Sequence, residues 1–174
     1  MPHTPKEIIL NYQIPEEVSR ITKTLRDAGF EAYLVGGCVR DMVLERKPKD
    51  WDVTTDAKPE QIQKLFTETF YENEYGTVGV VSETDDETVK VVEITPYRTE
   101  GVYSDKRRPD SVSFHAKLPD DLERRDFTIN AIAYDDSIGH PKGHVIDPYG
   151  GLKDIKDKVL RTVGSPYDRF HEDA

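Results

Sequence analysis

Two adjacent glycines between an apolar strand and a helix are the feature that most constrains this chain. The run 32–35 is short and apolar, and it leads directly into Gly36-Gly37. Apolar residues at helical spacing follow at Val39, Met42 and Val43. A strand that turns into a helix through glycine brings backbone N–H groups to one point, where an anion is favoured. The sequence therefore predicts either a phosphate-binding turn or a tight turn that needs glycine only for its dihedral angles.

Composition narrows the class of protein. The chain has 174 residues, with 24 Lys and Arg against 34 Asp and Glu, which gives a formal net charge of −10. Hydrophobic residues make up 36%, enough for one core, and no apolar run approaches the roughly 18 residues of a membrane span. The single cysteine, Cys38, excludes an internal disulfide and a cysteine-built zinc site. We therefore expect a cytoplasmic protein with no membrane partner, whose acidity argues against strong binding of nucleic-acid backbones by this chain alone.

Helical and strand patterns alternate along the chain. Ile14, Val18, Ile21 and Leu25 recur at helical spacing and predict an amphipathic helix with Pro15 at its first position. Further helices are expected at 39–46, 59–66, 152–160 and from 165. Strands are expected at 32–35 and 51–54, and a hairpin is expected to join 77–81 to 88–95. A mobile loop is expected at 99–110, and a helical turn followed by a buried segment over 122–134.

The sequence Asp50-Trp51-Asp52 places two carboxylates on one face if it lies on a strand, because side chains two residues apart point the same way. Two like charges on one face are unfavourable unless a cation neutralises them, and oxygen ligands suit Mg²⁺. The alternative is a solvated sheet edge that happens to carry two acids.

Glu93 is an acidic residue inside a valine-rich strand pattern. By alternation it shares a face with Val89 and Val91, where an uncompensated charge is unfavourable. A third carboxylate beside an aspartate pair would complete a site for two metal ions. The alternative is a strand end at which Glu93 reaches water or pairs with Arg98.

The segment 124–131 combines charge with hydrogen-bonding groups. Arg124, Arg125 and Asn130 could hold phosphate and sugar hydroxyls, with Asp126 orienting an arginine. The alternative is a solvated, charged helix end.

Four strings of residues, in this order, resemble the motifs of a known family: LVGGCVRD at 34–41, KDWDVTT at 49–55, RRDFTINA at 124–131 and RFHEDA at 169–174. Together with residues 107–109 and 146–151 they resemble the class II, bacterial-type tRNA nucleotidyltransferases. This family comprises CCA-adding enzymes and bacterial poly(A) polymerases. The resemblance implies an α/β (α+β) fold, the polymerase-β-type nucleotidyltransferase head, with a mixed β-sheet flanked by helices. It assigns residues 1–164 to the catalytic head domain and 165–174 to the start of a truncated neck helix.

The resemblance also implies a role for each matching residue. Asp50 and Asp52 match the metal-binding catalytic pair, and Glu93 matches the third catalytic carboxylate. The nucleotide-binding positions are Gly36, Gly37 and Arg40 on the triphosphate, Arg125 on the nucleotide, Asp126 and Asn130 on the ribose side, and Asp173, which with Glu172 begins the Glu-Asp-x-x-Arg element that reads the base.

The reaction implied by the resemblance is Mg²⁺-dependent transfer of CMP and AMP from CTP and ATP to the 3′ end of tRNA, with release of pyrophosphate. The tRNA would bind mainly through C-terminal domains that lie outside this sequence, so the fragment alone is expected to be weakly active or inactive. A poly(A) polymerase and an enzyme that adds only A or only CC remain alternatives. A non-catalytic nucleotide-binding module is an alternative of another class.

Overall fold

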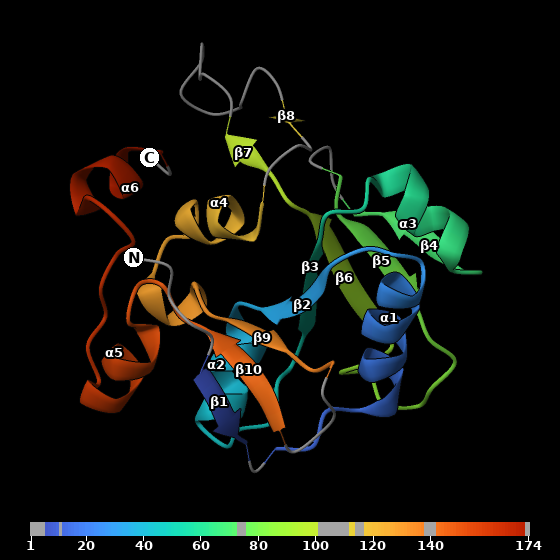
Figure 1. Ribbon diagram of the computed structural model, residues 1–174, viewed down its shortest axis with the longest axis horizontal. Helices are drawn as coiled ribbons and strands as arrows, with labels where there is room; N and C mark the ends of the chain where they lie inside the picture. Colours follow the sequence, from blue (N-terminus) through green and yellow to red (C-terminus); the bar gives the residue numbers. More distant parts are fainter. Residues whose placement is uncertain are drawn as a thin grey trace.

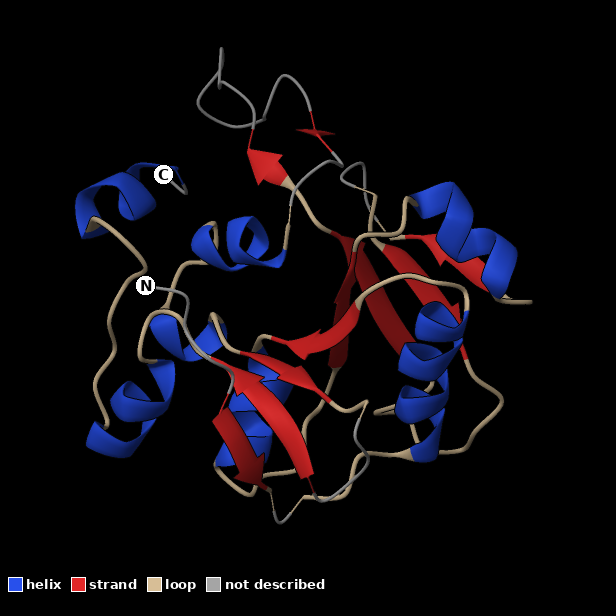
Figure 2. Cartoon of the chain, in the orientation of Figure 1, coloured by secondary structure: helices blue, strands red, loops and turns tan. Residues whose placement is uncertain are grey.

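An eight-stranded mixed β-sheet organises the computed structural model (Figure 1). The structure describes residues 6–10, 12–72, 76–100, 112–113, 117–137 and 142–172. The strands of this sheet are β1 (Lys6–Ile9), β2 (Ala32–Val35), β3 (Trp51–Thr55), β4 (Thr69–Tyr71), β5 (Val78–Val81), β6 (Val91–Pro96), β9 (Ala133–Asp135) and β10 (Lys142–Ile146). The helices are α1 (Glu16–Asp27), α2 (Gly37–Val43), α3 (Pro59–Leu65), α4 (Leu118–Glu123), α5 (Gly151–Asp157) and α6 (Pro166–Glu172), with a 3₁₀ turn, η1, at Thr128–Asn130. Figure 2 shows the strands surrounded by these helices. The predicted mixed sheet flanked by helices is confirmed.

The strand order is β1-β10-β9-β2-β3-β6-β5-β4. Strands β3 and β6 are parallel neighbours, and the other recorded pairs in this sheet are antiparallel. Asp52 is opposite Glu93 in the β3–β6 pair, and Thr54 is opposite Thr95. Because side chains alternate between the faces of a strand, these four residues lie on the same face of the sheet.

Helix α1 forms where the apolar spacing predicted it. Val18, Ile21 and Leu25 are buried on one side of the helix, as the three- and four-residue spacing requires. Pro15 is the N-cap, so the helix begins one residue later than predicted, at Glu16. Gly29 follows the last turn with φ +90°, a conformation that glycine adopts without strain.

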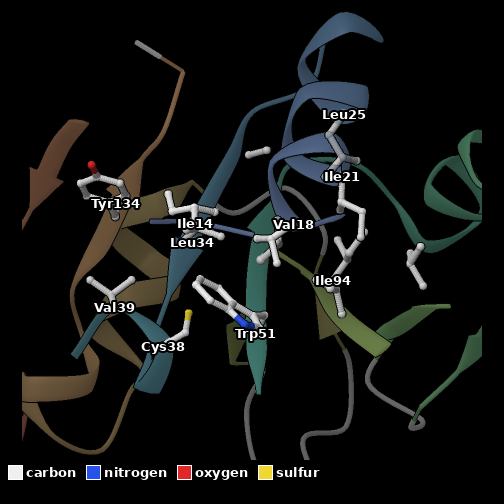
Figure 3. Packing of buried hydrophobic residues seen from close by; sticks show 14 of the residues in the cluster. Ile14, Val18, Ile21, Leu25, Leu34, Cys38, Val39, Trp51, Ile94 and Tyr134 are labelled. Carbon is white, nitrogen blue, oxygen red and sulfur yellow. The ribbon is translucent and has the colours of Figure 1, made fainter. Parts of the chain in front are cut away.

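The larger hydrophobic core lies on the face of the sheet that α1, α2 and α3 cover. It joins α1 to Leu34 of β2, Trp51 of β3 and Ile94 of β6. Figure 3 shows the labelled side chains of Leu34, Cys38 and Trp51 gathered in this core. Burying large apolar side chains of this kind is the main stabilising contribution to the fold, at roughly 1.5–3 kcal/mol for each.

A smaller core lies on the opposite face, beneath α4. It contains Val35, Tyr97, Leu118, Leu122 and Ala133. Helix α4 is therefore held against the face of the sheet that carries the two carboxylates of the β3–β6 pair.

Several predicted boundaries differ from the structure. Helix α2 ends at Val43, so Arg46 lies beyond it. The 77–81 and 88–95 hairpin is confirmed as β5 and β6, although β6 begins at Val91. Thr99–Glu100 forms a short strand, β7, paired with β8 at Val112–Ser113, rather than the start of a loop. Residues 101–110, the rest of the predicted mobile loop, lie outside the described residues.

Candidate active site

The turn from β2 into α2 places Gly36 beside two charged side chains. Gly36 has φ +77° and ψ −141°, and it caps the helix that begins at Gly37. A Cβ on Gly36 would lie 3.2 Å from Arg125 Nη1 and 3.6 Å from Asp52 Oδ2. The absence of a side chain is what lets a guanidinium and a carboxylate approach this backbone closely.

Asp52 and Glu93 are half-buried register neighbours on adjacent strands. Burial raises the pKa of Asp52, while the nearby Arg125 lowers this pKa and Asp50 raises it. Burial also raises the pKa of Glu93, and Asp52, Glu72 and Asp50 raise it further. Asp50 is exposed and precedes the first residue of β3, so the predicted pair occupies a strand end rather than two positions within the strand. The charge of Asp50 still raises the pKa of Asp52 and of Glu93.

Arg125 is held by a residue that the sequence analysis missed. The carboxylate of Asp121 is fully buried, and its Oδ2 accepts a hydrogen bond from Arg125 Nη2 at 3.1 Å. Its Oδ1 accepts from Arg124 Nε, also at 3.1 Å. The i, i+3 and i, i+4 spacing of an acid before two arginines is the signal that could have identified this contact.

Arg40 and Asn130, predicted from different motifs, are in direct contact. Arg40 Nη1 donates to Asn130 Oδ1 at 3.0 Å, and Arg40 Nε donates to Asp41 Oδ1 at 2.9 Å. The bond to Asn130 connects α2 to η1 beside the Gly36 turn, and the bond to Asp41 lies within α2. Asp126 has an exposed side chain, and the arginines take their recorded carboxylate contacts from Asp121 instead. Asp173 lies outside the described residues.

A cavity of about 390 Å³ opens next to this turn. Four of the predicted site residues line it, together with five other side chains, and the full set is Gly37, Cys38, Arg40, Asp41, Arg46, Lys47, Lys49, Asp50 and Asp52. Basic and acidic groups therefore share one opening, a combination that suits an anionic ligand carrying a cation.

The carboxylates fit a divalent cation in charge and donor type. Burial raises the pKa of Asp52 and Glu93, negative neighbours raise it further, and a cation would relieve this repulsion. Within the described residues, no group of three His, Cys, Asp or Glu side chains is arranged to hold a metal ion. Mg²⁺ commonly takes only one or two carboxylates and completes its shell with substrate phosphates and water. Asp52 and Glu93 match such a set of one or two carboxylates.

Comparison with known proteins decides the family. The family model that describes the poly A polymerase head domain matches residues 32–161 of the sequence. The chain belongs to the poly A polymerase head domain family. This confirms the resemblance inferred from the four motifs.

Relatives of this head domain include the CCA-adding enzyme of Ligilactobacillus salivarius, 47% identical over 165 residues that cover 92% of the chain. The crystal structure of the Bacillus stearothermophilus CCA-adding enzyme in complex with CTP matches 92% of the chain with 38% identity and a TM-score of 0.77. A tRNA nucleotidyltransferase complexed with a primer tRNA and an incoming ATP analog matches 82% with 32% identity and a TM-score of 0.61. The chain spans only 38%, 37% and 38% of these three proteins.

None of the helices in the described ranges is long and apolar enough to cross a membrane.

Proposed function

We propose that this chain is the catalytic head of a tRNA nucleotidyltransferase that adds CMP and AMP, from CTP and ATP, to the 3′ end of tRNA. The observation that carries the proposal is the meeting of Asp52 and Arg125 at the Gly36 turn, with Glu93 opposite Asp52 on the neighbouring strand. An acidic pair beside a guanidinium and an open backbone turn suits phosphoryl transfer, which depends on positioning and charge stabilisation. The CTP and tRNA complexes of the related structures support the same reading.

In the proposed reaction the terminal 3′-hydroxyl of tRNA attacks the α-phosphate of the nucleotide, and pyrophosphate leaves. Gly36 and Gly37 allow the triphosphate to approach backbone N–H groups, and Arg40 and Arg125 add positive charge there. Asn130, which already orients Arg40, is proposed to lie on the ribose side with Asp126.

Mg²⁺ is the proposed cofactor, with Asp50 and Asp52 as its ligands and Glu93 as the third catalytic carboxylate. When bound, the metal would neutralise the triphosphate and lower the pKa of the attacking hydroxyl. Arg125 lowers the pKa of Asp52 and so favours the ionised form that metal binding requires.

The wider assignments are proposals too. We assign residues 1–164 to the head and 165–174 to the start of a neck helix, with Asp173 on the nucleotide base. Most of the tRNA contact is assigned to parts of the protein outside this chain, because the chain is acidic and spans little more than a third of its relatives. The cytoplasm remains the predicted location.

Calorimetry on this chain tests the proposal. ATP titrated in the presence of Mg²⁺ should bind, and binding should be much weaker with EDTA or in Asp50→Ala. Asp27→Ala is the matched control, because it removes an exposed carboxylate on α1 that pairs only with Lys23 among its recorded contacts. We expect CTP, GTP and UTP to bind about as well as ATP, because the described site groups act on charge rather than on base edges.

Two results would count against the proposal. Nucleotide binding that is indifferent to Mg²⁺ and to Asp50→Ala would favour a non-catalytic nucleotide-binding module. If no nucleotide binds at millimolar concentration, the proposed function as a catalytic head is wrong.

A further inference from the structure

The buried carboxylate of Asp121 is the centre of a network that connects α4 to the strands bearing the acidic residues. Its side chain is 0% exposed. Arg124 donates to Oδ1, while Arg125 Nη2 and the hydroxyl of Thr54 donate to Oδ2, at 3.1 and 3.2 Å. A carboxylate removed from water is tolerated only where its oxygens are satisfied in this way.

The network reaches both acidic strands through Thr54. Thr54 is two residues after Asp52 on β3, and its hydroxyl also lies 3.1 Å from the carbonyl of Thr95 on β6. Thr95 in turn is two residues after Glu93. Asp121 is therefore fixed relative to the two strands that place Asp52 and Glu93 on one face.

Arg125 uses only part of its hydrogen-bonding capacity in this network. Nη2 is taken by Asp121, while Nη1 lies 3.2 Å from the position that a Cβ of Gly36 would occupy. Nε is buried and has no hydrogen-bond partner among the described residues. A buried donor without a partner is unfavourable, so the bond from Nη2 to Asp121 is what keeps the guanidinium in this position.

We propose that Asp121 is a positioning residue for the nucleotide site. It holds one end of the Arg125 guanidinium against β3, so that Nη1 stays at the Gly36 turn beside Asp52, where an anionic ligand would meet it. The inference rests on the proposed function, because it takes a nucleoside triphosphate as that ligand.

A double-mutant cycle separates positioning from a general structural role. Mg²⁺-dependent ATP binding is measured by calorimetry in the parent, Asp121→Asn, Arg125→Gln and the double variant. Hydrogen bonds to charged groups are each worth enough that Asp121→Asn should weaken binding by about tenfold in the parent. In the Arg125→Gln background the same change should weaken binding by less than about twofold, because the group that Asp121 positions is already gone.

Asp136→Asn is the matched control. Asp136 also binds a threonine hydroxyl, Thr22 Oγ1 at 2.8 Å, and an arginine, Arg26, but these contacts join α1 to the end of β9. We expect this variant to lose thermal stability and to retain the parent affinity for ATP.

Thr54→Val is the second variant if Asp121→Asn does not fold. It preserves the charge and packing of the network and removes one donor to Oδ2, so binding should weaken by about threefold, again only when Arg125 is present. Equal losses with and without Arg125, or no loss in whichever of the two variants folds, would overturn the inference. Failure of the parent chain to bind ATP would instead be a failure of the proposed function.

Discussion

Asp52 on β3 and Glu93 on β6 are opposite one another in the parallel strand pair of the sheet, and the pKa of Glu93 is raised first by burial and then by the charge of Asp52. Like charges placed directly opposite on neighbouring strands destabilise a sheet. Without a cation, this part of the fold is therefore less stable than its packing alone would make it.

Asp52→Asn should relieve this repulsion. We expect the free energy of unfolding of the ligand-free chain to rise by about 0.2–1 kcal/mol, while Mg²⁺-dependent nucleotide binding falls sharply. Because the pKa values of Asp52 and Glu93 are raised on folding, the stability that these two groups contribute is fully present below their ordinary pKa values and is lost as the pH rises through the raised ones. Urea denaturation at several pH values should show a shallower loss in Asp52→Asn. Identical pH profiles would contradict the proposed coupling.

The two glycines of the turn should respond differently to alanine. Gly36 has φ +77° and ψ −141°, a region nearly restricted to glycine, so Gly36→Ala should lower the free energy of unfolding by about 1–3 kcal/mol. Its Cβ would also press on Arg125 and weaken ATP binding. Gly37→Ala places its Cβ 3.4 Å from the guanidinium of Arg40, an ordinary van der Waals contact within a helix, and should change stability by less than about 1 kcal/mol. Thermal unfolding of both variants tests this difference in stability.

Cys38 should be chemically inert in the folded chain. Burial raises the pKa of its thiol to about 12, and the thiolate is the form that reacts. We expect negligible labelling by a disulfide reagent at pH 8 and complete labelling in denaturant. Because this pKa is raised on folding, stability should also fall as the pH rises from the ordinary thiol value towards 12. Rapid labelling of the native chain at pH 8 would show that the site is open.

The hydroxyl groups of two buried tyrosines should contribute differently to the free energy of unfolding. The Tyr97 hydroxyl donates to Glu31 Oε2 at 2.8 Å, so Tyr97→Phe should lower the free energy of unfolding by about 1–2 kcal/mol. The Tyr134 hydroxyl is buried and finds no hydrogen-bond partner in the described part of the chain. Tyr134→Phe should therefore leave stability unchanged or raise it by up to about 1 kcal/mol. Chemical denaturation of the two variants, measured side by side, tests the contrast.

Local patterns in the sequence predict most of the fold because they act over a few residues. The spacing of Val18, Ile21 and Leu25 is sufficient to define one face of α1, and the glycine pair marks where β2 becomes α2. The position of Asp50 was less predictable. Strand β3 begins only at Trp51, and the exact end of a strand depends on pairing with β2 and β6 rather than on its own residues.

The contacts within the candidate site depend on tertiary packing. Alternation along β6 put Glu93 on a face with Val89 and Val91, but the residues of β6 that enter the core are Val92 and Ile94, so Glu93 lies on a half-buried face. The segment 124–131 predicts that Asp126 orients an arginine. Asp121 does so instead, from three and four residues before the two arginines. What the sequence does not encode is the packing of α4 against the sheet, which brings the same carboxylate to Thr54 of β3, 67 positions away.

The candidate site joins residues that are far apart along the chain. The Thr54 hydroxyl reaches Thr95 across 41 positions and Asp121 across 67, and Arg40 reaches Asn130 across 90. Contacts of such long range form late in folding, because large loops must close first. A ribosome-bound chain that has passed Glu93 but has not yet reached Arg125 carries the acidic residues without the arginine that offsets them. The proposed ability to hold a nucleotide is therefore acquired abruptly, once Arg125 and Asn130 have been added to the chain, and not built up by degrees.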